Sequence, residues 1–147
     1  MVLSICIVNY NGRDFLPACI ESILESELDG APEIVIVDNG SEDGSVELIE
    51  ELFPDVKIIK NGINEGFASA NNRAFGSAGG RYVLFLNPDT VVPPDAIGRM
   101  VSFLDGNDGI HLVFFTELLN FLPGNWLGKC RIERHSPGIN FGGPFDF

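Results

Sequence analysis

The 147-residue sequence has little positive charge, few cysteines and no long uninterrupted apolar run. It carries 9 Lys and Arg against 21 Asp and Glu, which gives a formal net charge of −12. Non-specific nucleic-acid binding needs clustered basic side chains that neutralise phosphates, so no nucleic-acid partner is expected. A small anionic ligand is still compatible with this charge, because a metal ion or backbone N–H groups can bind phosphate locally.

The three cysteines, Cys6, Cys19 and Cys130, have spacings that fit neither a zinc site nor a disulfide framework. Cys6 lies in an apolar run and Cys19 on a helical pattern, which predicts buried thiols and a reducing, cytoplasmic setting. The stretch MVLSICIVNYNGRD has no basic leader, and we interpret it as neither a signal peptide nor a membrane span. The apolar segment 110–122 is too short and too interrupted to cross a bilayer as one helix.

Two common nucleotide-binding fingerprints are missing. No GxGxxG follows the first strand-like run, and no GxxxxGK[ST] occurs anywhere. Dinucleotide binding of the Rossmann type and phosphate binding by a P-loop are therefore disfavoured.

Strand-like and helix-like segments alternate through the first hundred residues. Apolar, β-branched runs occupy 3–9, 33–38, 56–61 and 81–87. Helical spacing of apolar residues occupies 13–26, 45–53, 65–78 and 93–106, with Ser45 expected as an N-cap and Pro17 in an early turn. Four alternations with short links predict an α/β fold, with a mostly parallel sheet and helices on both faces.

The alternation ends after Gly106. The run 110–115 fits a fifth strand and 116–122 a short helix, whereas 123–147 is rich in Gly, Pro and aromatic residues and is expected to be loop. We therefore predict an α/β domain over 1–105 and an irregular extension of the same domain, partly disordered, over 106–147.

Polar residues follow each of the four predicted strands. The clusters are Asn9-Tyr10-Asn11-Gly12, Asp38-Asn39-Gly40-Ser41, Asn61 with Asn64 and Gly66, and Asn87-Pro88-Asp89-Thr90. Each alone is ordinary turn chemistry, in which Asp38 would cap its turn and Tyr10 would be a surface aromatic. In a parallel sheet all four clusters share one rim, where ligands of such folds bind, and this coincidence favours a ligand site.

The segments VNYNG, IVIVDNGSEDGS, NEGFASANNRAF and YVLFLNPDTVVPPDAI resemble, in order and spacing, the N-terminal half of family 2 inverting glycosyltransferases of the GT-A fold. They are most similar to the rhamnosyltransferase-like branch. The resemblance implies that 1–105 binds a nucleotide-diphosphate sugar, such as a UDP- or dTDP-sugar. It also implies transfer of the sugar, with inversion, to a saccharide or lipid-linked acceptor.

The resemblance further implies a role for each matching residue. Asn9 and Tyr10 would contact the base, with Tyr10 stacking on it, and Asp38 and Asn39 would contact the base or the ribose. The nucleotide pocket would be lined by Asn64, Gly66 and Asn71, whereas Phe67 and Phe75 are expected in the core. The Asp-x-Asp metal motif of the family falls on Asn87-Pro88-Asp89, so Asp89 is expected to bind Mn²⁺ or Mg²⁺ and Asn87 the ribose or a water.

The general base of the family lies in an acceptor-binding half that residues after 105 do not match. Asp146, in GGPFDF, is a weak candidate for it, and Glu117 and Glu133 are no better supported. His111 and His135 are expected to be structural or solvent-facing. Two interpretations stay open: a glycosyltransferase, as a short form or a fragment, or a nucleotide-sugar-binding module without transfer activity. A nucleotidyltransferase fits less well, because NYNGRD offers only Arg13 in place of a basic, Gly-rich loop.

The acceptors of the resembled family include lipid-linked and cell-surface polysaccharides. A peripheral encounter with the inner face of the membrane is therefore expected. The apolar segment 110–122 would then be core, a membrane contact or a homodimer contact.

Overall fold

The structure is a computed structural model that describes residues 2–106, 112–115 and 130–133. Six strands form one sheet in the order β3-β2-β1-β4-β5-β6. Every neighbouring pair from β3 to β5 is parallel, and β6 pairs with β5 antiparallel. The strands are β1 (Leu3–Asn9), β2 (Glu33–Asp38), β3 (Lys57–Lys60), β4 (Tyr82–Leu86), β5 (Leu112–Phe115) and β6 (Cys130–Glu133). The predicted α/β fold with a mostly parallel sheet is confirmed.

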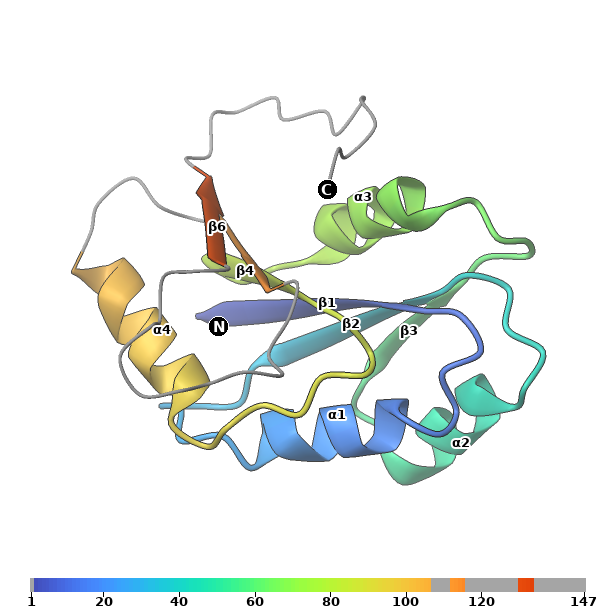
Figure 1. Ribbon diagram of the computed structural model, residues 1–147, viewed down its shortest axis with the longest axis horizontal. Helices are drawn as coiled ribbons and strands as arrows, with labels where there is room; N and C mark the ends of the chain where they lie inside the picture. The colour runs from blue at the N-terminus through green and yellow to red at the C-terminus, as the bar shows by residue number, and fades with distance from the viewer. Residues whose placement is uncertain (1, 107–111, 116–129, 134–147) are drawn as a thin grey trace.

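Helices cover both faces of the sheet, as predicted. They are α1 (Leu16–Leu24), α2 (Ser45–Leu52), α3 (Phe67–Ser77) and α4 (Ala96–Asp105). Figure 1 shows α3 on one side of the sheet and α1 and α2 on the other. Ala70 and Ala74 of α3 pack against Cys6, Val35 and Phe85 in one core cluster. Side chains of α1, α2 and α4 join a larger cluster on the opposite face.

The two described cysteines behave as buried apolar residues. Cys6 and Cys19 are unpaired thiols in the core, as the sequence predicts. Burial raises the pKa of each thiol from 9.0 to about 12. Because only the thiolate reacts, neither side chain is a nucleophile at neutral pH.

Three local predictions are wrong in detail. Ser45 is not the N-cap of α2: that position is Gly44, at φ 75°, and Ser45 is the first helical residue. The prolines expected to open α4 lie before its N-cap, Asp95. Within 123–147, assigned as loop, residues 130–133 form β6, because pairing with β5 supplies a partner that local composition does not reveal.

Glu33 joins three segments at the amino end of the sheet. Its carboxylate accepts hydrogen bonds from the Ser4 hydroxyl and the Gly79 N–H. Burial raises the pKa of Glu33, but the Gly79 and Ser4 hydrogen bonds and the charge of Lys57 outweigh it and leave the pKa below its usual value. This stabilisation is present above the unfolded-state pKa, near 4.5, and is lost as pH falls through the lower folded-state pKa.

Substitution Glu33→Gln should therefore lower the thermal midpoint at pH 7 more than at acidic pH. Thermal unfolding of both proteins from about pH 7 to about pH 3 measures the difference, which should narrow as the wild-type carboxyl is protonated. The exposed Glu51→Gln is the control for loss of one surface charge. A difference between wild type and Glu33→Gln that stays constant over this range would contradict the assigned cause.

Candidate functional site

The carboxyl ends of the parallel strands bring the predicted polar clusters to one rim. Asn9 pairs with Asp38 at the ends of β1 and β2, and the β4 end lies on the other side of β1. The connections run outward in both directions from β1 and β4, so the strand order reverses between them. In open α/β sheets a ligand binds beyond the strand ends at this position. The two loops that flank it touch, because a Cβ built on Gly12 would lie 3.8 Å from the Pro88 Cβ.

Asn9 fastens the loops after β1 and β2 to each other. Its side chain is 0% exposed. The amide nitrogen donates to Asp38 Oδ1 at 2.8 Å, to Ser45 Oγ at 2.9 Å and to Ser41 Oγ at 3.1 Å, while the amide oxygen accepts from the Gly12 N–H at 3.1 Å. An amide with all these partners has no capacity left for a ligand, so Asn9 lies at the rim as a structural residue.

The Asp38 carboxylate is largely occupied too. It is 4% exposed. Oδ1 accepts from Asn9, and Oδ2 accepts from the backbone N–H groups of Gly40 at 3.2 Å and Ser41 at 3.0 Å. Asp38 therefore caps the turn after β2, which was the simpler of the two interpretations of this residue.

A chain of asparagine amides joins the ends of β2 and β3 to the start of α3. Asn61 Nδ2 donates to Asn39 Oδ1 at 3.0 Å, and Asn39 Nδ2 donates to Asn64 Oδ1 at 2.8 Å. The backbone N–H of Glu65 donates to Asn39 Oδ1, and that of Gly66 to Asn64 Oδ1. Asn39 is 2% exposed, so it too lies below the rim surface.

The N-terminus of α3 faces the rim and begins at a glycine. Gly66 is the N-cap, with φ 86°, and the space where its Cβ would lie is open. Glycine is required there by the positive φ. Phe67 is 44% exposed, so its expected core position is wrong, because the first turn of α3 projects past the sheet edge. Phe75 packs as expected and stacks on Phe85 of β4 with ring centroids 6.4 Å apart.

Asn71 carries a buried amide nitrogen without a described partner. The residue is 2% exposed, and its Nδ2 makes no hydrogen bond to the described part of the chain. It lies four residues from Phe67 and from Phe75, hence on the same side of α3. Since Phe75 faces β4, Asn71 lies one helical turn nearer the carboxyl rim on that side.

Asn87 and Asp89 follow β4 at the rim. Asn87 is half-buried and its carbonyl accepts from the Cys19 thiol at 3.7 Å, whereas Asp89 is exposed. None of the ion pairs between described residues involves Asp89. No group of three or more potential metal ligands occurs in the described part of the chain. Because Mg²⁺ and Mn²⁺ prefer oxygen ligands, Asp89 and Asn87 fit a cation shared with the phosphates of a ligand rather than one held by protein alone.

Two exposed aromatic side chains flank the loop after β1. Tyr10 is 54% exposed and Phe15 is 57% exposed. Tyr10 follows Asn9 directly, so it lies at the rim, where its ring is open to a flat ligand. Phe15 is the N-cap of α1.

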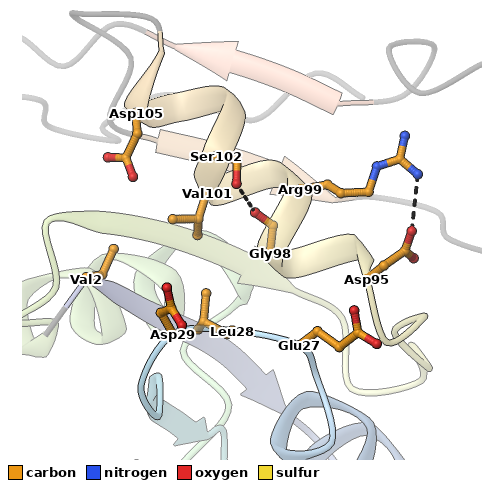
Figure 2. Close-up of a pocket in the computed structure, with 10 residues that line it drawn as sticks. All are labelled: Val2, Glu27, Leu28, Asp29, Asp95, Gly98, Arg99, Val101, Ser102 and Asp105. Atoms are coloured by element: carbon orange, nitrogen blue, oxygen red, sulfur yellow. Dashed lines mark hydrogen bonds and ion pairs between the residues drawn. The ribbon is translucent and has the colours of Figure 1, made fainter.

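A cavity of about 740 Å³ lies at the opposite end of the sheet. Figure 2 shows it between α4 and the segments that precede β1 and β2. Its lining includes Glu27, Asp29, Asp95 and Asp105, and Gly98 of α4 approaches the Glu27 carbonyl. Arg81 and Arg99 form ion pairs with Asp105 and Asp95, respectively, each at 3.1 Å. No residue predicted for the site lines this cavity.

The sequence patterns did not single out Ser45 or Arg73. Ser45 accepts a hydrogen bond from Asn9, and Arg73 donates one to Asn61. No local pattern marks them, because their partners lie 36 and 12 residues away along the chain. Asp146, Glu117, His111 and His135 lie outside the described residues, as does most of 110–122. No helix in the described segments is long and apolar enough to span a membrane.

This fold is that of GT-A glycosyltransferases. TarS of S. aureus, solved alone and in complex with UDP-GlcNAc, matches 72% of the chain with a TM-score of 0.67 and 23% identity, over 32% of its own length in that complex. A mannosyltransferase from Pyrobaculum calidifontis, solved with GDP-Man and Mn²⁺, matches 74% with a TM-score of 0.66 and 24% identity, over 33% of its length.

Residues 4–127 match the model of glycosyl transferase family 2, and the chain belongs to that family. An uncharacterized glycosyltransferase of Nostoc is 34% identical over 124 residues, which are 82% of this chain and 38% of that protein. A PGL/p-HBAD biosynthesis glycosyltransferase of Mycobacterium bovis is 28% identical over 137 residues, 90% of this chain and 53% of that protein. The chain thus spans roughly a third to a half of these relatives.

Proposed function

We propose that this chain binds a nucleotide-diphosphate sugar across the carboxyl ends of β1, β2 and β4, as the donor-binding part of an inverting glycosyltransferase. One observation carries the proposal: the loops after β1 and β4 meet where the strand order reverses, and they bring Tyr10 and Asp89 to the same rim. The ligand-bound relatives support the class of ligand. The rhamnosyltransferase-like branch stays a prediction.

The buried network divides the predicted residues into two groups. Asn9, Asp38 and Asn39 have their polar atoms occupied by the protein, and we assign them to holding the loops in place. Direct contacts fall to residues with free capacity at the rim. Tyr10 would stack on the base, Asn64 and Asn71 would donate hydrogen bonds, and Gly66 would allow close approach of the backbone.

The diphosphate would lie between the α3 N-terminus and the end of β4. Helix N-terminal N–H groups and the helix dipole favour an anion at that end of α3. Asp89 would hold a divalent cation, with Asn87 beside it binding the ribose or a water. When bound, that cation would stabilise the charge that develops on the departing diphosphate.

Transfer further requires a base that deprotonates the acceptor hydroxyl. Of the two acids assigned to the described rim, Asp38 is occupied by hydrogen bonds and Asp89 is assigned to the cation. Neither is free for this role, so the base is proposed to lie elsewhere, and Asp146 keeps its place as a weak candidate. The acceptor is proposed to be a saccharide or lipid-linked sugar, met at the inner face of the membrane.

Calorimetry of UDP and dTDP, each with and without Mn²⁺ or Mg²⁺, tests the proposal directly. We expect binding of at least one of the two nucleotides, strengthened by the cation. Absence of binding to both, with and without the cation and with GDP as a third probe, would contradict it.

Substitution Tyr10→Ala should weaken UDP binding by about fivefold to a hundredfold, because stacking of a base on an aromatic ring contributes about 1–3 kcal/mol. Tyr10→Phe keeps the ring and should bind like wild type. Phe15→Ala is the matched control, since it removes an equally exposed aromatic from the same loop region. If Tyr10→Ala binds UDP as wild type does, or if Phe15→Ala is equally weak, the stacking role is wrong.

A further inference from the structure

The asparagine chain of the rim has a direction, and Arg73 sets it. An asparagine side chain has a donor end and an acceptor end, and a row of them can in principle run either way. Arg73 has only donors, and one of them contacts Asn61 Oδ1. The Asn61 oxygen must therefore face Arg73, which turns its nitrogen toward Asn39 Oδ1, at 3.0 Å.

The same polarity continues to the surface of the rim. Asn39 Nδ2 donates to Asn64 Oδ1 at 2.8 Å, and the backbone N–H of Gly66 donates to that oxygen at 2.9 Å. The chain thus has a donor-only group at each end, and both fix the same orientation. Asn39 Oδ1 also accepts from the Glu65 N–H at 3.0 Å, which removes the alternative orientation in the middle.

This polarity decides which atom Asn64 shows to a ligand. Its oxygen is occupied by two donors, so its amide nitrogen is the end left over, and the residue is exposed. We propose that Arg73 is a positioning residue that makes Asn64 present N–H groups at the nucleotide site. The ligand group recognised there is then a hydrogen-bond acceptor, either a carbonyl oxygen of the base or a phosphate oxygen.

This inference rests on the proposed function for its ligand but not for its geometry. Arg73 is on the second turn of α3 and reaches the rim only through Asn61. Both inner members of the chain are nearly buried, Asn61 at 5% and Asn39 at 2% exposure, so water does not easily replace them. The two amides therefore transmit the orientation without touching the ligand themselves.

Calorimetry with UDP on four forms of the full chain tests the relay: wild type, Arg73→Met, Asn64→Ala and the double variant. One correctly oriented hydrogen bond is worth about a threefold to tenfold change in affinity, so Arg73→Met and Asn64→Ala should each weaken UDP by that factor. The double variant should bind no more weakly than Asn64→Ala, because Arg73 acts through Asn64. Arg73→Lys keeps a donor and should restore most of the affinity.

Multiplicative losses in the double variant would overturn the relay, since they would mean that Arg73 contacts the nucleotide itself. Wild-type affinity of Arg73→Met would overturn it as well. Arg99→Met, which removes an arginine at the other end of the sheet, controls for the change in net charge. Repeating the set with uridine and UMP locates the acceptor: a base carbonyl gives the same loss with all three ligands, and a phosphate gives no loss with uridine.

The side-chain amide NMR signals test the geometry without any ligand. In wild type, the Asn61 and Asn39 NH₂ groups should exchange slowly with solvent, and Arg73→Met should accelerate both. If wild type binds no nucleotide but shows this pattern, the proposed function fails and the relay stands. If Arg73→Met leaves both exchange rates unchanged, the relay fails whatever the protein binds.

Discussion

Replacing Asp89 by Asn should abolish most of the cation-dependent gain in nucleotide affinity. Asp89 is the exposed carboxylate at the end of β4, and the fit of the site is to a cation shared with a diphosphate. Losing the only carboxylate assigned to that cation should weaken UDP binding in Mn²⁺ by about tenfold to a hundredfold, or about 1.4–2.8 kcal/mol. Calorimetry of UDP with saturating Mn²⁺ and with a chelator measures both states.

The chelated state is the internal control for this prediction. Without a cation the Asp89→Asn protein should bind UDP at least as well as wild type, because one negative charge near the diphosphate has been removed. Asp55→Asn, an exposed acid between α2 and β3, should keep the full response to Mn²⁺. An Asp89→Asn protein that gains as much affinity from Mn²⁺ as wild type would refute the metal role.

Replacing Asn9 by Ala should destabilise the fold more than any other rim substitution. The change removes a fully buried amide and leaves the Gly12 N–H and the Asp38 carboxylate each short of a partner. Unpaired buried polar groups cost about 1–3 kcal/mol each, and more when charged, so we expect the free energy of unfolding to fall by about 3–5 kcal/mol. Urea unfolding at pH 7 gives this quantity.

Asn72→Ala is the matched comparison for that experiment. It makes the same chemical change at a half-buried site on α3, where alanine also favours the helix, and should alter stability by no more than about 0.5 kcal/mol. A loss of less than about 1 kcal/mol in Asn9→Ala would show that water satisfies the exposed partners and that the network does not hold the rim together.

Much of the fold could be predicted from local patterns. The runs LSICIVN and EIVIVD are apolar throughout because both faces of β1 and β2 are buried, and such runs are typical of parallel strands. Helical spacing located α1 to α4 to within a few residues. The strand β6 could not be found this way, since CRIE has no β-specific pattern and forms a strand only by pairing with β5.

The site was predicted as a place more accurately than as a set of roles. Turn residues at four strand ends were enough to locate one rim, because parallel strands share their carboxyl edge. Whether a residue such as Asn39 faces a ligand or the protein depends on partners more than 20 residues away, which no spacing rule contains. The same reason hides Arg73, whose importance comes only from the amide that it orients.

Backbone amide NMR during a titration with UDP and Mg²⁺ tests the central claim most directly. We predict that the largest shift changes fall on Tyr10, Asn64, Gly66 and Asp89, at the carboxyl rim. Residues around the cavity at the other end, such as Val2, Gly98 and Ser102, should stay unchanged. Changes concentrated around that cavity, or no changes at saturating UDP, would contradict nucleotide binding where the order of the strands reverses.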